Sequence, residues 1–116
     1  MLKFIEYTKC STCKKAKKYL DELGLEYHSR HIVEEKLNEA ELTALYHKSG
    51  LPLKRLFNTS GLKYKELKLK DKLPTMSEEE QIALLATDGM LVKRPIIETD
   101  NTVLIGFKAT EYDNLR

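Results

Sequence analysis

Two cysteines, Cys10 and Cys13, stand two residues apart in the segment YTKCSTCKKAKKYL. A thiolate is both a nucleophile and a metal ligand, so this C-x-x-C spacing can serve redox chemistry, metal binding or simple packing. The separation is about one helical turn, which lets two sulfur atoms meet in a disulfide. In the redox interpretation Cys10 attacks as the nucleophile, and Cys13 resolves the mixed disulfide that forms.

The motif stands where a predicted strand gives way to a predicted helix. Residues 2–7 mix β-forming residues with alternating charge, as a strand does. Gly24 marks the end of the helix that follows, and residues 25–33 predict a second strand. The apolar stripe of the helix consists of Ala16, Tyr19, Leu20 and Leu23. We therefore expect an opening β-α-β unit with two parallel strands.

At this junction Cys10 would lie at the first turn of the helix. Its sulfur would face unpaired backbone N–H groups and the positive end of the helix dipole, both of which stabilise an anion. Lys9 and Lys14 add positive charge nearby. We expect the pKa of Cys10 to fall far enough to give thiolate at neutral pH, with Cys13 as the more covered partner.

Two histidines raise the metal alternative. CSTC at residues 10–13 and HSRH at residues 28–31 give C-x2-C-x14-H-x2-H, which is close to a zinc-finger spacing. However, His28 and His31 are three residues apart on a predicted strand, so their side chains point to opposite faces. One of them could not reach the cysteines, and we expect no metal site.

Burial without chemistry is the third alternative, because free cysteines are often core residues. Cys13 fits this alternative, since it precedes Ala16 by three residues on the same helical stripe. Cys10 fits it badly, since it stands between the polar residues Lys9 and Ser11 in a loop. The redox interpretation accounts for both cysteines.

The middle of the chain predicts helices from about residue 36 to residue 90. Two N-cap pairs start helices there, Asn38 with Glu41 and Ser77 with Glu80. In such a pair the side chains satisfy free N–H groups at the start of the helix. We therefore expect a helical lobe inserted over about residues 36–90.

The end of the chain returns to β structure. Residues 90–107 hold two β-rich runs that are joined by the turn-forming residues 99–102. Pro95 would stand at the head of the first strand, since proline is poorly tolerated inside a sheet. The expected fold class is α/β, with a single domain over residues 1–116.

The composition is that of a soluble protein, with 41% hydrophobic residues, 33% charged residues and a net charge of +2. That charge is too small to predict direct binding of nucleic acid. No apolar run approaches the roughly 20 residues that cross a bilayer, so we expect no membrane partner. We expect a cytoplasmic protein, in which two cysteines indicate redox or metal chemistry rather than a structural disulfide. The sequence contains no dimer signal, so we expect a monomer.

Several stretches together resemble the arsenate reductase/Spx (ArsC-like) family. They are the C-x-x-C motif at the mouth of a β-α unit, LFNTSGLKYKEL, LLATDGMLVKRP and, within the same region, LVKRPII. Their order and spacing match the family over nearly the whole chain, and they resemble its short branch with C-x-x-C. The resemblance implies a thioredoxin-like fold with an inserted helical lobe.

The same resemblance implies roles for individual residues. Cys10 falls on the nucleophilic cysteine of the family, and Pro95 on the cis-proline that faces the active-site thiol. Arg94 falls on an arginine that binds the oxyanion in arsenate reductases. The family needs no metal or organic cofactor, and electrons would come from a thiol donor such as glutathione, glutaredoxin or thioredoxin.

Two departures from the arsenate reductases bear on the substrate. The enzymes linked to glutaredoxin have one cysteine in the motif, where this chain adds Cys13. They also use two further arginines, whose places fall on Asn58 and near Phe107 and Lys108. A tetrahedral oxyanion that lacks two of three guanidinium groups loses most of its charge-assisted hydrogen bonds. We therefore expect a thiol–disulfide oxidoreductase whose physiological substrate is not arsenate.

The alternative function comes from the Spx side of the resemblance. Spx also carries C-x-x-C as a redox switch, and it regulates transcription by binding the C-terminal domain of the RNA polymerase α subunit. Gly50 stands near the place of a glycine that is important to that contact. The alternative is a redox-sensing regulator that binds the α subunit without turnover.

Overall fold

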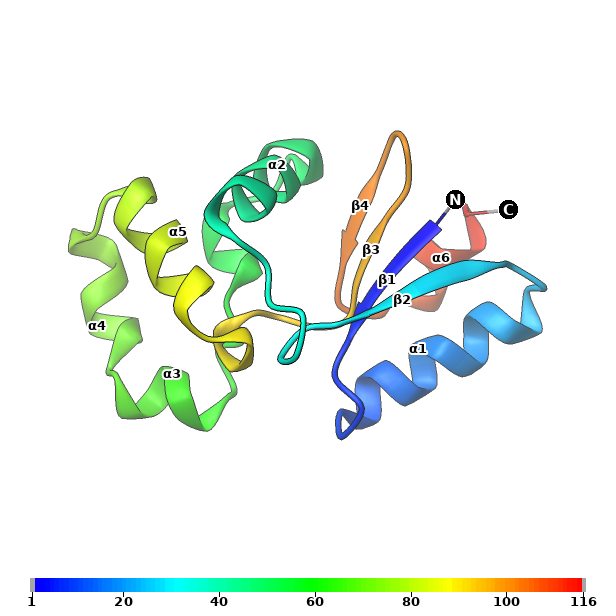
Figure 1. Cartoon of the computed structure of the whole chain (residues 1–116), viewed down its shortest axis with the longest axis horizontal. Helices are drawn as coiled ribbons and strands as arrows, with labels where there is room; N and C mark the ends of the chain where they lie inside the picture. The colour runs from blue at the N-terminus through cyan, green and yellow to red at the C-terminus, as the bar shows by residue number, and fades with distance from the viewer. Residues whose placement is uncertain (1, 116) are drawn as a thin grey trace.

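A mixed four-stranded sheet forms one end of the molecule in the computed structural model, which describes residues 2–115 (Figure 1). The strand order is β2-β1-β3-β4. β1 pairs with β2 in parallel, and β3 pairs antiparallel with both β1 and β4. The strands are β1 (Leu2–Glu6), β2 (Tyr27–His31), β3 (Ile96–Glu98) and β4 (Val103–Ile105). The predicted β-α-β unit with parallel strands is confirmed.

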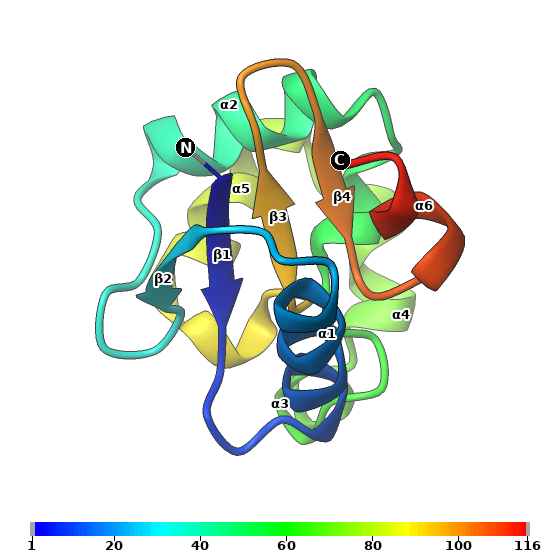
Figure 2. The same cartoon turned by 90° about the vertical axis from the view of Figure 1, so that its right-hand side faces the viewer.

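Helices cover both faces of this sheet, because successive residues of β1 point to opposite sides. Phe4 packs with Leu20 and Tyr112 on one side, whereas Ile5 joins a second core that contains Leu42. The bounds of the covering helices are Ser11–Glu22 for α1, Ala109–Asp113 for α6 and Glu39–Ser49 for α2. Figure 2 shows α1 and α6 on the first side of the sheet and α2 behind the second side.

The helical lobe lies between β2 and β3 in the sequence and extends away from the sheet in Figure 1. Both predicted N-cap pairs form capping boxes, in which Asn38 and Glu41 begin α2 and Ser77 and Glu80 begin α5. After α2 the elements are η1 (Leu53–Leu56), α3 (Leu62–Glu66), α4 (Leu69–Lys72), η2 (Leu73–Thr75), α5 (Glu78–Thr87) and η3 (Gly89–Leu91). The predicted α/β class with an inserted helical lobe is therefore confirmed.

A short antiparallel pairing joins the lobe to the segment that leads into β3. The amide of Lys93 donates to the carbonyl oxygen of Leu56 at 2.7 Å, and the amide of Asn58 donates to that of Leu91 at 2.7 Å. These two bonds fix the loop before α3 beside the residues that precede β3. They bring the two segments together near the start of α1.

The structure differs from the sequence prediction in the lengths of some elements. The second strand was expected over residues 25–33 and spans Tyr27–His31. Within the predicted helical stretch, the polar residues 62–75 form three short elements, α3, α4 and η2. Tyr64, Leu69 and Leu73 are buried in the lobe core, and this burial stabilises short helices that local sequence alone would not. Among the described residues, no helix has the length and apolar character needed to cross a bilayer.

Candidate active site

Cys10 is the N-cap residue of α1, with an extended backbone at φ −91° and ψ 118°. The backbone N–H of Cys13 donates to the Cys10 Sγ at 3.2 Å. The backbone N–H of Cys10 donates to the carbonyl oxygen of Tyr7 at 3.0 Å, which closes the turn between β1 and α1. The helix terminus is therefore aimed at the sulfur, as an anion at this position requires.

The two thiols have opposite pKa shifts. Burial raises the pKa of Cys10, but hydrogen bonds from Cys13 and the charge of Arg94 outweigh it, so the net shift is downward. At Cys13, burial is the largest cause of an upward pKa shift, and the hydrogen bond with Cys10 acts in the same direction. Together they raise the pKa of Cys13 to about 12. The side chain of Cys13 is only 1% exposed, whereas Cys10 is partly exposed. Cys10 is thus the thiol that can ionise and react first.

Arg94 supplies the positive charge beside this thiol. Its guanidinium lies over the ring of Tyr7, with Cζ 4.9 Å from the ring centroid. Its Nη1 donates to the carbonyl oxygens of Met90 and Val92, each at 3.4 Å. Its Nε is buried and has no hydrogen-bond partner among the described residues. The peptide bond between Arg94 and Pro95 is cis.

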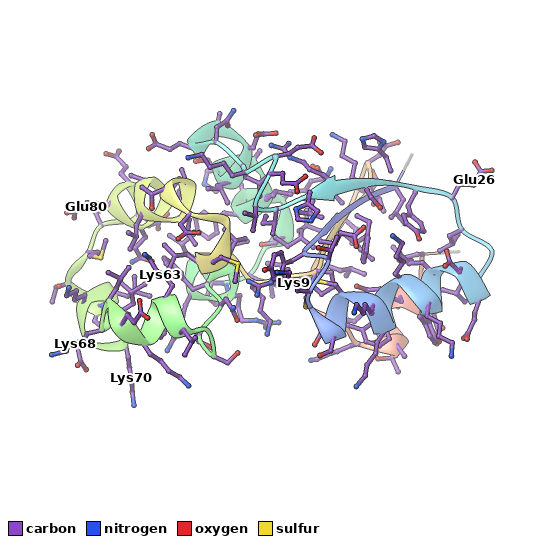
Figure 3. The ribbon with its side chains drawn as sticks, turned by 60° about the horizontal axis from the view of Figure 1, so that its bottom comes forward. Lys9, Glu26, Lys63, Lys68, Lys70 and Glu80 are labelled. Carbon is purple, nitrogen blue, oxygen red and sulfur yellow. The ribbon has the colours of Figure 1, made fainter. Side chains whose placement is uncertain are left out.

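A pocket of about 610 Å³ opens in front of Cys10. The start of α1 forms one wall, and the loop that leads into α3 faces it. Figure 3 shows Lys9 at the turn before α1 and Lys63 on the helical lobe. The charged side chains that line the pocket are Lys9, Lys63, Lys93, Arg94, Glu66 and Asp88.

The structure brings some of the predicted site residues together and separates others. Cys10 and Arg94 both line the pocket, while Cys13 is buried one turn further along α1. Pro95 is buried at the head of β3 and is not among the pocket-lining residues. The cation that lowers the pKa of Cys10 is Arg94, rather than the neighbouring lysines that the sequence suggested.

Other residues of the site were not expected from the sequence. The ring of Tyr7 contacts Arg94, and its carbonyl oxygen accepts a hydrogen bond from the backbone N–H of Cys10. Nothing in the local sequence indicates either role. Lys63 and Lys93 enter the pocket from the helical lobe and from the segment before β3. Their positions depend on packing between distant segments, so no spacing rule would have found them.

The two positions that fall on the further arginines of the arsenate reductases have different surroundings in the structure. Asn58 lines the pocket, and its Oδ1 accepts a hydrogen bond from Ser60 at 3.3 Å. Phe107 instead packs against Tyr19 and Tyr112, with ring centroids 5.7 and 4.9 Å away. Arg94 is the one arginine among the described residues that line this pocket.

The two histidines of the metal alternative diverge. His28 lies beside Lys3 in the sheet register and lines a separate hollow next to α2. His31 lies beside Glu6 in the register, and its Nε2 is 3.3 Å from the hydroxyl of Thr8. Within residues 2–115, no group of three His, Cys, Asp or Glu side chains could hold a metal ion. The two histidine rings therefore have different neighbours.

Comparison with protein families and curated sequences gives a consistent set of relatives. The profile of the ArsC family matches residues 5–115. An uncharacterized protein of Bacillus subtilis, YusI, is 54% identical over 112 residues, which cover 97% of this chain and 95% of YusI. The regulatory protein MgsR of the same organism is 26% identical over 110 residues, covering 95% and 86% of the two chains. The global transcriptional regulator Spx of Enterococcus faecalis is 26% identical over 112 residues, covering 96% and 83%.

Solved structures give the same relationship. An ArsC family related protein from Bacteroides fragilis is 56% identical, with a TM-score of 0.97 and coverage of 99% of this chain and 97% of that protein. A possible arsenate reductase from Streptococcus mutans is 44% identical, with a TM-score of 0.90 and the same coverage of 99% and 97%. At these TM-scores the fold of the relatives agrees with the present one over nearly the whole chain.

Proposed function

Since the chain belongs to the ArsC family, we propose that it is a thiol–disulfide oxidoreductase in which Cys10 is the nucleophile and Cys13 the resolving thiol. The observation that carries this proposal is the opposite pKa shift of the two thiols at the start of α1. A lowered pKa supplies the attacking thiolate, and a raised pKa keeps the second thiol protonated until it is needed.

The reaction begins with attack of the Cys10 thiolate on one sulfur of a substrate disulfide. A mixed disulfide forms, and the other substrate sulfur leaves as a thiolate that takes a proton from solvent. Cys13 then loses its proton and attacks the Cys10 Sγ, so that the Cys10–Cys13 disulfide forms and the second substrate sulfur leaves. Two electrons pass from the two protein thiols to the substrate. Attack turns Cys10 from a thiolate into a disulfide sulfur, which removes the negative charge that helped to keep Cys13 protonated.

Arg94 stabilises the thiolate form of Cys10 before attack, and it attracts an anionic group of the substrate to the pocket. Pro95 holds the segment after Arg94 in place at the head of β3. No metal or organic cofactor takes part, because the two thiols carry both electrons. A cytoplasmic thiol donor such as glutathione, glutaredoxin or thioredoxin returns the protein to the dithiol state.

Arsenate is not the substrate that we propose. Arg94 is the single arginine among the described pocket residues, and Asn58 occupies the pocket without a positive charge. Phe107 faces an aromatic cluster rather than the pocket. The three lysines of the pocket act as point charges, so Arg94 alone can provide a bidentate contact to a tetrahedral oxyanion.

Mass spectrometry of the reduced protein after exposure to oxidised glutathione tests the dithiol mechanism. The wild type is expected to lose two hydrogens as the Cys10–Cys13 disulfide forms, while Cys13→Ala is expected to retain glutathione on Cys10. Cys10→Ser is expected to abolish thiol-dependent turnover. A wild type that stops at a stable glutathione adduct on Cys10 would show that Cys13 is a bystander and that the protein works as a monothiol.

A redox-sensing regulator is the second candidate, and the similarity to MgsR and Spx favours it. In this role the state of the Cys10–Cys13 pair would change the affinity of the protein for the RNA polymerase α subunit, without turnover. Gly50, which stands near the place of the glycine that the resemblance links to this contact, ends α2 in a left-handed conformation at φ 68°. A pull-down with the C-terminal domain of the α subunit, in the oxidised and the reduced state, separates the two functions. Absence of binding in both states rules out the regulator.

A further inference from the structure

We propose that the active-site pocket continues into a basic groove that binds an acidic, cysteine-bearing segment of a protein substrate. This inference rests on the proposed function and names its substrate class. The groove consists of the pocket in front of Cys10 and a second hollow of about 360 Å³ that shares Lys93 with it. The two hollows therefore adjoin at Lys93.

Positive charge is concentrated along this groove. Among the residues that the structure describes, two carboxylates line it, Glu66 and Asp88. The basic side chains that line it are Lys9, Lys54, Arg55, Lys63, Lys93 and Arg94. The excess of basic over acidic groups in the groove is larger than the net charge of +2 of the whole chain. The rest of the molecule is therefore net negative, and the groove is the face that attracts an acidic partner.

Most of this charge is not neutralised within the molecule. The Nζ of Lys63 lies 4.0 Å from the carboxylate of Asp88. Among the described residues, this is the single ion pair that these basic groups form. The other five have no carboxylate within ion-pair distance in the part of the chain that the structure describes. Unpaired cations that converge on one groove favour a ligand that brings several negative charges.

The size and the apolar parts of the groove favour a polypeptide over a small disulfide. Leu62 stands at the edge of the first hollow with 78% of its side chain exposed. Pro52, which is exposed, lines the second hollow together with Lys93. A hollow of the first one's size can accommodate a small molecule by itself. A ligand that contacts both Leu62 and Pro52 must span the two hollows, as a peptide does.

The chemistry is the disulfide exchange described above, with the acidic segment as oxidant. Cys10 attacks the disulfide of the segment, and one segment sulfur leaves as a thiolate that is protonated by solvent. Cys13 then displaces the second segment sulfur and the Cys10–Cys13 disulfide forms. The segment gains two electrons and two protons, and a single turnover needs no reductant beyond the two thiols of the protein.

Two synthetic peptides test the groove. Both carry the same internal disulfide, which is flanked by glutamates in one peptide and by lysines in the other. Each peptide is mixed with the reduced protein for a single turnover, the reaction is quenched at a series of times, and mass spectrometry measures how much peptide has been reduced. At low salt the acidic peptide is expected to react about tenfold faster or more, and the advantage is expected to shrink as salt is added. Equal rates, or a faster lysine peptide, would overturn the proposal.

Charge-reversal variants locate the effect. The double variant K54E/R55E changes the second hollow and leaves Cys10 untouched, and it is expected to remove most of the preference for the acidic peptide. The matched control K70E/K72E makes the same change in net charge on α4, where both lysines are exposed and neither lines the groove. An equal loss of preference in both variants would mean that overall charge, rather than the groove, selects the peptide.

A neutral small substrate separates this inference from the proposed function. Hydroxyethyl disulfide carries no charge, so its reduction by wild type and by both double variants is expected to be equal. If neither it nor the peptides are reduced, the proposed function fails. In that case, the binding of labelled, reduced peptides to the Cys10→Ala protein, measured by fluorescence anisotropy, still tests whether the groove prefers the acidic peptide. Tighter binding of the acidic peptide supports the groove, and equal or absent binding refutes it.

Discussion

The guanidinium of Arg94 lies over the aromatic ring of Tyr7, with 4.9 Å between Cζ and the ring centroid. The carbonyl oxygen of Tyr7 also accepts the backbone N–H of Cys10 at 3.0 Å. Tyr7, the residue that follows β1, thus contacts both Cys10 and the cation that lowers the pKa of Cys10. A cation over an aromatic face is stabilised by about 0.5–2 kcal/mol, so Tyr7 helps to hold Arg94 beside the thiolate.

Substitution of Tyr7 tests this arrangement. Tyr7→Leu removes the ring under Arg94, which is expected to loosen the guanidinium, raise the pKa of Cys10 and slow its alkylation a few-fold at neutral pH. Tyr7→Phe keeps the aromatic face and is expected to behave like the wild type. The measurement is the rate of iodoacetamide alkylation against pH. A wild-type profile in Tyr7→Leu would show that the ring does not position Arg94.

Arg94→Gln removes the positive charge beside Cys10 and keeps a polar, though shorter, side chain. The pKa of Cys10 is expected to rise, because the charge of Arg94 favours the thiolate and the opposing effect of burial remains. The ultraviolet absorbance of the thiolate, followed as pH increases, reports the midpoint. Lys93→Gln is the matched control, since Lys93 also lines the pocket but is not among the causes of the shift. If both variants shift the midpoint equally, the charge of the whole pocket acts on Cys10 instead of Arg94 specifically.

The two thiols are expected to react at very different rates at neutral pH. Cys10 is partly exposed with a lowered pKa, whereas Cys13 is 1% exposed with a pKa raised to about 12. Limited iodoacetamide is therefore expected to modify Cys10 on the order of a hundredfold faster than Cys13, as peptide mapping would reveal. The rate at Cys10 is expected to rise with pH and level off below the usual thiol pKa of about 8.5. Comparable labelling of both cysteines would contradict the proposed assignment of attacking and resolving thiols.

Gly89 is expected to be essential for the packing of the lobe against the end of β2. A Cβ added at this position would lie 2.2 Å from the carbonyl oxygen of Ile32, which is backbone and cannot rotate away. Gly89→Ala is expected to lower the free energy of unfolding by about 3 kcal/mol or more, since overpacking forces backbone shifts. Chemical denaturation measures the loss.

Gly24→Ala is the control for this prediction. Gly24 has open space around its Cβ position but a φ of +72°, so only the conformational cost of about 1 kcal/mol applies. A loss at Gly89 no larger than the loss at Gly24 would show that the segment between α5 and β3 can shift to make room.

The local structure of this protein could be predicted from the sequence because its signals are local. Helical periodicity and Gly24 set the extent of α1, and the capping boxes at Asn38 and Ser77 mark the starts of two helices. The position of Cys10 at a helix N-terminus follows from its neighbours alone. The resemblance to the arsenate reductase/Spx family, carried by short motifs in a specific order, is confirmed by the match to the ArsC family.

Tertiary structure decided which charges act on the thiols. Arg94 is distant from Cys10 in the sequence, and β3 must pair with β1 before the two can share a pocket. The same packing placed Tyr7 under Arg94 and brought Lys63 of the lobe to the rim. Electrostatic effects depend on distance and burial in three dimensions, whereas helix periodicity and capping depend on residues a few positions apart. The sequence by itself therefore determined that Cys10 and Cys13 begin a helix, and only the folded chain decided what surrounds them.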